Sequence, residues 1–223
     1  MTEESFSISD LQQQWRALIG ELAPNADTNQ VLATFEDLVQ RYSEPTRAHH
    51  TLEHISEMLT LISAHESALA SPNEVKAATW FHDIIYNSRA TDNEEQSIEH
   101  ARRKLTMLGV TPKTIDVISS YILATKQHEL PADCDPNSDL AFFLDADMSI
   151  LASEGKRYRE YALGSAFEYG WATNIDGKDL YTPARLQFLR KVSSRPIFHT
   201  DIMQPLEEQA RTNIDWEIMK LQT

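Results

Sequence analysis

Glycine is scarce in this chain, with six residues in 223, and this shortage constrains the fold more than any other feature. A β-rich fold needs many tight turns, and the favoured hairpin turns require positive φ angles that glycine adopts most readily. Apolar residues instead recur at the three-and-four spacing of an amphipathic helix. One such stretch holds Val31, Leu32, Phe35, Leu38, Val39 and Tyr42. We therefore predict an all-α fold.

Residues that start or stop helices divide this pattern into ten predicted helices. The four residues from Ser71 to Glu74 combine a capping box with a proline in the first helical turn. Thr28 is placed to cap the second helix, and Gly109 to end the fifth. We expect helices over residues 10–22, 28–42, about 50–66, 72–86, 93–109, 112–124, 140–152, 158–171, 182–189 and 206–221.

The net charge of −14 is spread along the chain and excludes one class of partner. Duplex nucleic acid requires a basic stripe that displaces counterions from phosphates, and the sequence has none. A small anionic substrate would instead need local attraction, which a bound divalent cation supplies.

The sequence also predicts the cellular compartment in which the protein is found. Its single cysteine, Cys134, excludes an internal disulfide framework, and the residues after Met1 lack the pattern of a signal peptide. No apolar run approaches the roughly 18 residues that a membrane span needs. We expect a cytoplasmic protein without membrane association, folded as a single domain.

Ionisable residues interrupt three apolar helix faces. His82, followed by Asp83, falls within the predicted stripe of residues 75–86, and His54 shares a face with Met58. Asp147 falls in a third stripe, which holds Leu140, Phe143, Leu144 and Leu151. A buried carboxylate costs several kcal/mol unless a partner or a metal compensates it. The pattern predicts a metal site formed by His54, His82, Asp83 and Asp147.

Two features of this ligand set stay open. Neighbouring residues of a helix do not face each other, so His82 and Asp83 can share one ion only if each side chain reaches around the helix. Asp145 is the alternative to Asp147, because two residues lie about 200° apart on a helix and cannot both face one ion. We favour Asp147 because it continues the apolar stripe.

The ligand types indicate which metals fit. Imidazole and carboxylate donors suit divalent Mn, Fe, Co, Ni or Mg. The lack of thiolates argues against a structural zinc site, although zinc remains among the candidate cofactors.

The order His54, His82-Asp83, Asp147 resembles the signature of the HD superfamily of metal-dependent phosphohydrolases. Residues 47–54 also resemble the Tyr-His-Asn-x-x-His segment of cyclic-nucleotide phosphodiesterases, with His49 in place of Tyr and Thr51 in place of Asn. The sequence more closely resembles a bacterial group described as predicted metal-dependent HD phosphohydrolases, through Tyr42-Ser43-Glu44-Pro45, Trp80 to Tyr86, Asn93-Glu94 with Ser97, Phe143 to Asp147, Tyr158, Tyr161, Glu168-Tyr169 and Ala210-Arg211-x-Asn213.

The resemblance implies one HD-type domain over residues 1–223. Its metal-site core would cover about 28–152, with C-terminal helices over 154–223 packing on it. By position it implies that His54 binds the metal and that His50 is a proton donor.

The implied reaction is hydrolysis of a small phosphorylated compound, such as a nucleotide, by metal-activated water. Asp83 or Asp147 would orient or deprotonate the water, and His50 would protonate the leaving oxygen. Further residues are candidates for contacts with the substrate or a second metal: Glu94, Lys126, His128 and Asp145.

Two other classes of protein fit the sequence. One is a non-catalytic module that keeps the metal site and acts as a nucleotide sensor or a regulatory partner. The other is a metal-free helical scaffold, in which Glu94 simply begins a helix and the histidines are core residues. The sequence makes no prediction of the oligomeric state.

Overall fold

The structure is a computed structural model that describes residues 7–223. Over these residues it has ten α-helices, four short 3-10 helices and no strand, apart from an isolated bridge between Ile175 and Lys178. The predicted all-α fold is confirmed.

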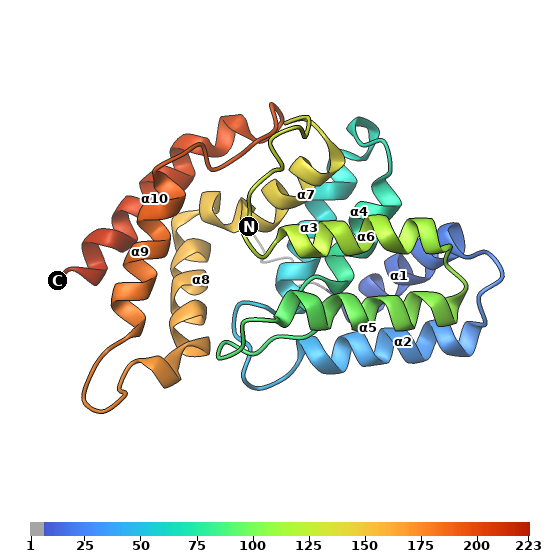
Figure 1. The fold of residues 1–223 in the computed structure, drawn as a ribbon, viewed down its shortest axis with the longest axis horizontal. Coiled ribbons are helices and arrows are strands. Elements are labelled where there is room, and N and C mark those ends of the chain that lie inside the picture. The colour runs from blue at the N-terminus through green and yellow to red at the C-terminus, as the bar shows by residue number, and fades with distance from the viewer. Residues whose placement is uncertain (1–6) are drawn as a thin grey trace. The chain divides into compact units, whose positions relative to one another are not determined.

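Residue contacts divide the chain into two compact units. Figure 1 colours the chain by residue number, so each unit can be followed by its residues. The first unit takes the chain as far as Glu44 and then His50–Pro131. The second takes Pro45–His49 and Ala132–Thr223. The sequence placed the end of the metal-site core at about residue 152, whereas the contacts divide the chain after Pro131.

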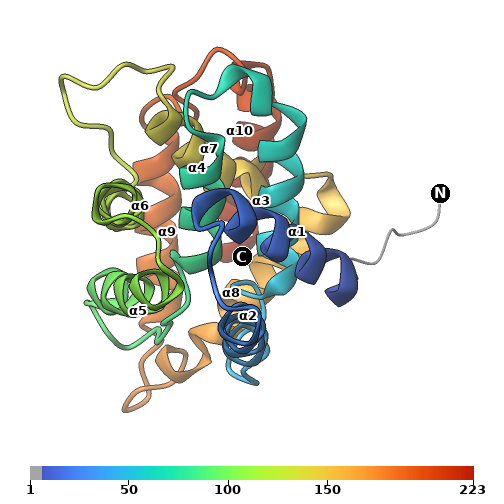
Figure 2. The same cartoon turned by 90° about the vertical axis from the view of Figure 1, so that its right-hand side faces the viewer.

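The first unit contains six α-helices and one 3-10 helix. Helices α5 and α6 pack side by side, and Figure 2 shows both nearly end-on. The elements are α1 (Ile8–Leu22), α2 (Thr28–Tyr42), α3 (Leu52–Ala64), η1 (Glu66–Ala68), α4 (Pro72–Phe81), α5 (Asn93–Leu108) and α6 (Pro112–Ala124).

Helix α4 is the central element of this unit. It contacts α1, α3, α5 and α6, and every residue from Ala77 to Phe81 is buried. The Trp80 indole packs edge-to-face on Trp15 and on Phe35, which anchors α4 against α1 and α2. The C-terminal end of α4 is therefore held in a fixed place.

The caps differ in detail from the predicted ones. Asp27, rather than Thr28, caps α2 by accepting hydrogen bonds from the backbone N–H groups of Asn29 and Gln30, each at 3.0 Å. The Ser71 side chain makes no cap hydrogen bond, although Pro72 does begin α4. Gly109 ends α5 with a φ of 88°, as predicted.

The second unit contains four α-helices and three 3-10 helices. Helix α10 contacts η2, α8 and α9 and so organises the unit. The elements are α7 (Asp139–Met148), η2 (Ser149–Ala152), α8 (Gly155–Glu168), η3 (Gly170–Ala172), α9 (Tyr181–Ser193), η4 (Gln204–Leu206) and α10 (Glu207–Leu221).

A buried charge cluster holds these helices together. The Glu217 carboxylate on α10 accepts hydrogen bonds from Tyr158 Oη at 2.6 Å and from Arg185 Nε at 2.8 Å. The Arg185 guanidinium also lies over the Tyr161 ring, 4.9 Å from its centroid. One carboxylate thus ties α8, α9 and α10 together.

None of the helices in the described part of the chain combines the length and the apolar character that crossing a membrane requires.

Candidate metal centre

The segment after α4 carries the His82-Asp83 pair. The sequence predicted a helix as far as Tyr86, but α4 ends at Phe81 and the chain turns at His82 and Asp83. That part of the prediction is wrong. The early end of the helix removes the difficulty that it posed, because adjacent residues in a turn can direct their side chains to one place.

The His82 ring has a defined tautomer. Its Nδ1 lies 2.9 Å from the carbonyl oxygen of Thr79, which can only accept a hydrogen bond, so Nδ1 carries the proton. In the neutral ring, Nε2 then presents a lone pair, and it lies 3.0 Å from Asp83 Oδ2. Two lone pairs at this distance repel each other unless a cation, either a proton or a metal ion, lies between them.

His54 brings a second imidazole to this place from α3, which packs against α4. The centroids of the His54 and His82 rings are 5.5 Å apart, with 67° between the ring planes. Only 2% of His54 and 1% of His82 is exposed. We call His50, His54, His82 and Asp83 the histidine corner.

His50 joins the corner from outside a helix. The prediction placed it on the helix of His54, but α3 begins at Leu52 and His50 lies in the turn before it. Its ring stacks on Tyr86, with centroids 4.0 Å apart, and its Nε2 lies 3.9 Å from Asp83 Oδ2. About 22% of its side chain is exposed, so His50 is the histidine of the corner that solvent reaches best.

Two polar residues of α5 hold the segment that follows the corner. Ser97 Oγ accepts a hydrogen bond from Ile85 N at 3.2 Å and donates one to Ile85 O at 3.3 Å. Asn93 pairs with the backbone of Asn87 in the same reciprocal way, at 3.0 Å each. Both residues support the loop after Asp83.

Lys126 and Glu94, two candidates for substrate contact, bind to each other. Lys126 Nζ lies 3.9 Å from Glu94 and donates hydrogen bonds to Glu95 and to the Thr91 carbonyl oxygen. The hydrogen bond to Glu95 raises the pKa of Lys126 and lowers the pKa of Glu95. His128, a third candidate, lies just after α6 with a φ of 49°.

Asp145 and Asp147 differ in a way that the sequence did not indicate. Asp145 is completely buried and Asp147 is half-buried, so the stripe that favoured Asp147 does not describe the buried face of α7. Asp145 accepts hydrogen bonds from the backbone N–H of His199 and of Thr200 and from Thr200 Oγ1, at 2.8, 2.8 and 2.7 Å. Burial raises its pKa, while these bonds oppose the shift. Asp145 therefore anchors residues 199–200.

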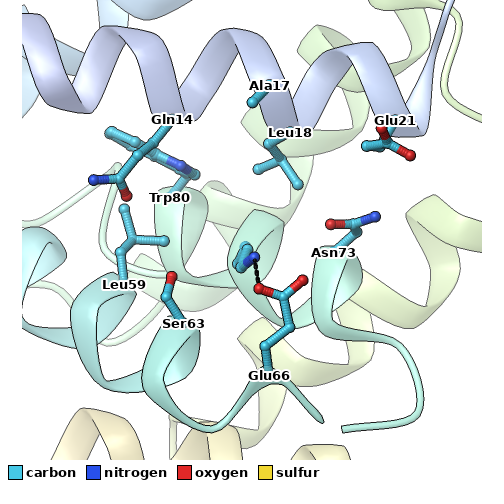
Figure 3. A pocket seen from close by; sticks show the side chains of 10 residues that line it. Gln14, Ala17, Leu18, Glu21, Leu59, Ser63, Glu66, Asn73 and Trp80 are labelled. Carbon is cyan, nitrogen blue, oxygen red and sulfur yellow. Dashed lines mark hydrogen bonds and ion pairs between the residues drawn. The ribbon is translucent and has the colours of Figure 1, made fainter.

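A cavity of about 420 Å³ lies elsewhere in the first unit, between α1, α3 and α4 (Figure 3). An ion pair between Lys76 and Glu66, at 2.8 Å, borders it. Its lining includes Gln14, Leu18, Glu21, Leu59, Asn73 and Trp80, and none of the predicted site residues.

Sequence reasoning missed the role of Tyr86, which was counted as a core residue of α4. No periodic signal marks it, because its stacking on His50 depends on the turn at His82 and Asp83. Ser97 and Asn93, which the family resemblance includes, support the loop after Asp83 through hydrogen bonds to its backbone.

Comparisons of the chain with protein-family models, with curated proteins and with solved structures give no significant match.

The donor atoms of the corner fit a divalent cation. His82 has the arrangement usual for a metal-binding histidine, in which the far ring nitrogen donates to a backbone carbonyl and the near one directs its lone pair inward. Two imidazoles and a carboxylate match the preferences of Mn, Fe, Co, Ni and Zn.

Proposed function

We propose that this protein is a divalent-metal-dependent phosphohydrolase whose centre is the histidine corner. The single observation that carries the proposal is the contact between His82 Nε2 and Asp83 Oδ2, because in the neutral ring these two acceptor atoms repel each other unless a cation, either a proton or a metal ion, lies between them. In the proposed site, His54, His82 and Asp83 would hold the ion, and the sequence pattern adds Asp147 as a further ligand.

The bound ion would supply Lewis-acid polarisation of a phosphoryl oxygen and would lower the pKa of water. Residues of the chain would supply the proton and orient the attacking water. His50 would protonate the leaving oxygen, since its ring is partly exposed to solvent and lies beside Asp83. Tyr86 holds the His50 ring by stacking, and Asp83 would orient the attacking water.

The proposed substrate is a small phosphorylated compound such as a nucleotide. The overall charge of −14 repels anions, so binding would depend on the local cation. We also propose, from the composition, a cytoplasmic location.

The test combines elemental analysis with turnover. Purified protein should contain at least about one equivalent of a divalent metal. It should also hydrolyse members of a panel of nucleotides and phosphoesters. His82→Ala and Asp83→Ala should abolish both properties while the circular dichroism of the helices is unchanged. His65→Ala, at the other end of α3, is the matched control and should behave like the wild type.

Two results would contradict the proposal in different ways. Protein that binds no divalent metal would mean that His82 is an imidazolium paired with Asp83, and the chain would be a helical scaffold. Protein that retains metal but hydrolyses nothing with several metals supplied would be a non-catalytic sensor or regulatory module.

A further inference from the structure

A five-residue segment, Pro45–His49, belongs by its contacts to the second unit although residues of the first unit flank it on both sides. We call it the strap. The Glu168 carboxylate on α8 captures it, since Oε1 accepts hydrogen bonds from Ala48 N at 2.7 Å and from His49 N at 2.8 Å. One carboxylate oxygen therefore fixes two consecutive peptide groups.

The surface of α8 is shaped for the strap. A Cβ atom added at Gly164 would lie 3.1 Å from the carbonyl carbon and oxygen of Ala48 and 3.3 Å from His49 N, closer than ordinary contact. The His49 ring packs edge-to-face on Tyr161 of the same helix, with centroids 4.6 Å apart. Glycine at position 164 thus lets the strap backbone lie directly on α8.

The burial of Glu168 shows that these bonds matter. Only 6% of the residue is exposed, and a carboxylate in such a place is costly unless strong donors satisfy it. Hydrogen bonds from backbone N–H groups to an ionised carboxylate are shorter and stronger than neutral ones, as the 2.7 and 2.8 Å distances indicate.

The residue that follows the strap is His50. Fixing the amides of residues 48 and 49 leaves only the two backbone dihedrals of His49 between the held segment and the peptide group that leads to His50. We propose that Glu168, with Gly164 beside it, is a positioning residue for His50, whose ring stacks on Tyr86. The catalytic consequence rests on the function proposed above, whereas the positioning itself does not.

The first test uses two variants that disturb the strap by different means. Glu168→Gln replaces the charged acceptor, and Gly164→Ala leaves it intact but adds the obstructing Cβ. We expect both to lower kcat about 10- to 100-fold, with KM and metal content nearly unchanged. Glu160→Gln, at an exposed position of α8, and Gly170→Ala, where an added Cβ meets nothing within 4 Å, are the matched controls.

A double-mutant cycle then asks whether Glu168 acts through His50. In a His50→Gln background, Glu168→Gln should cause no further loss of kcat, because the group that it positions is already absent. Losses that multiply would show that Glu168 stabilises the fold in general, and this result would overturn the proposal.

The second test does not depend on turnover. Stacking on Tyr86 should shift the Hε1 resonance of His50 upfield, and His50→Gln assigns that signal. Glu168→Gln and Gly164→Ala should move it toward the position of an exposed histidine, while both control variants should not. An unmoved signal in a folded variant would refute the positioning role. A moved signal in a protein without turnover would keep that role and refute the proposed hydrolase instead.

Discussion

Two histidine–carboxylate contacts of the first unit are similar in distance and differ in the hydrogen bond that the other ring nitrogen makes. His100 Nε2 lies 2.8 Å from Asp37 Oδ2, and His82 Nε2 lies 3.0 Å from Asp83 Oδ2. In His100, Nδ1 accepts a hydrogen bond from Arg103 Nη2 at 3.1 Å, so Nε2 carries the proton and donates it to Asp37. In His82 the tautomer is reversed.

The surroundings of the carboxylates differ as well. Asp37 also contacts Lys104 at 2.9 Å and Arg41 at 3.1 Å. Burial raises the pKa of Asp37, but the hydrogen bond and charge of Lys104, with His100 and Arg41, lower it overall. Asp83 lies against the imidazoles of His82 and His50.

The comparison teaches that a histidine beside a carboxylate is not by itself the mark of a metal site. The decisive feature is whether the other ring nitrogen, Nδ1, donates or accepts a hydrogen bond. An arginine at Nδ1 completes an ordinary hydrogen-bonded pair at His100, whereas the carbonyl oxygen at Nδ1 of His82 makes Nε2, in the neutral ring, a second acceptor beside Asp83.

The largest expected difference between the two pairs is in metal binding. His82→Ala and Asp83→Asn should weaken divalent-metal affinity by about 100-fold or more, since loss of groups that merely support ligands already costs 10- to 100-fold. His100→Gln should leave the affinity unchanged and lower the free energy of unfolding by about 1–3 kcal/mol. Calorimetric titration with Mn²⁺ and urea denaturation measure the two effects. If variants of both histidine–carboxylate pairs lost metal affinity equally, the proposed difference between the pairs would be wrong.

Asp145 and Asp147 extend the comparison to the second unit. Asp147→Asn should reduce metal affinity about 10- to 100-fold with little change in stability. Asp145→Asn should do the reverse, lowering the free energy of unfolding by about 2–4 kcal/mol, because it weakens three hydrogen bonds to a buried carboxylate. If Asp145→Asn alone removed the metal, Asp145 would be the ligand.

Acidification should affect the His100 pair through stability. Burial and the charge of Arg41 lower the pKa of His100 below 6.5 in the folded state, so below pH 6.5 the unfolded chain binds more protons and stability falls. Asp37 stays ionised in both states down to about pH 4 and does not contribute in this range. Urea midpoints at pH 8 and pH 5.5 should therefore differ less in His100→Gln than in the wild type. An equal difference in the two proteins would show that His100 titrates normally.

The smallest effect is expected at Lys126. Its ammonium is engaged by Glu95, Glu94 and Thr91, so Lys126→Met should leave metal affinity unchanged and the unfolding midpoint nearly so. The substrate KM is the sensitive measurement. A rise in KM with kcat unchanged would show that Lys126 also contacts the substrate.

Much of the fold was predictable because local signals determine it. Apolar periodicity located the ten helices, and Thr111-Pro112 and Gly109 marked boundaries that the structure keeps. The end of α4 was not predictable, since residues 82–86 continue an apolar pattern, whereas in the structure the backbone of Ile85 makes tertiary hydrogen bonds with Ser97.

The candidate site was predictable in its residue types and less so in its geometry. Sequence order brought out His54, His82 and Asp83, and the structure places these three together. The difference between Asp145 and Asp147 was not accessible, because it depends on donors more than 50 residues away at His199 and Thr200. Periodicity also did not indicate that α3 begins only at Leu52 and leaves His50 in the turn before it.

The strap has a consequence for anyone who dissects this protein. A fragment that starts at Ala132 would omit Ala48 and His49, so Glu168 would lose two strong hydrogen bonds in a desolvated place. Such a fragment should express poorly and should be cleaved rapidly in limited proteolysis. A synthetic peptide spanning residues 45–49 would be the natural complement to restore it.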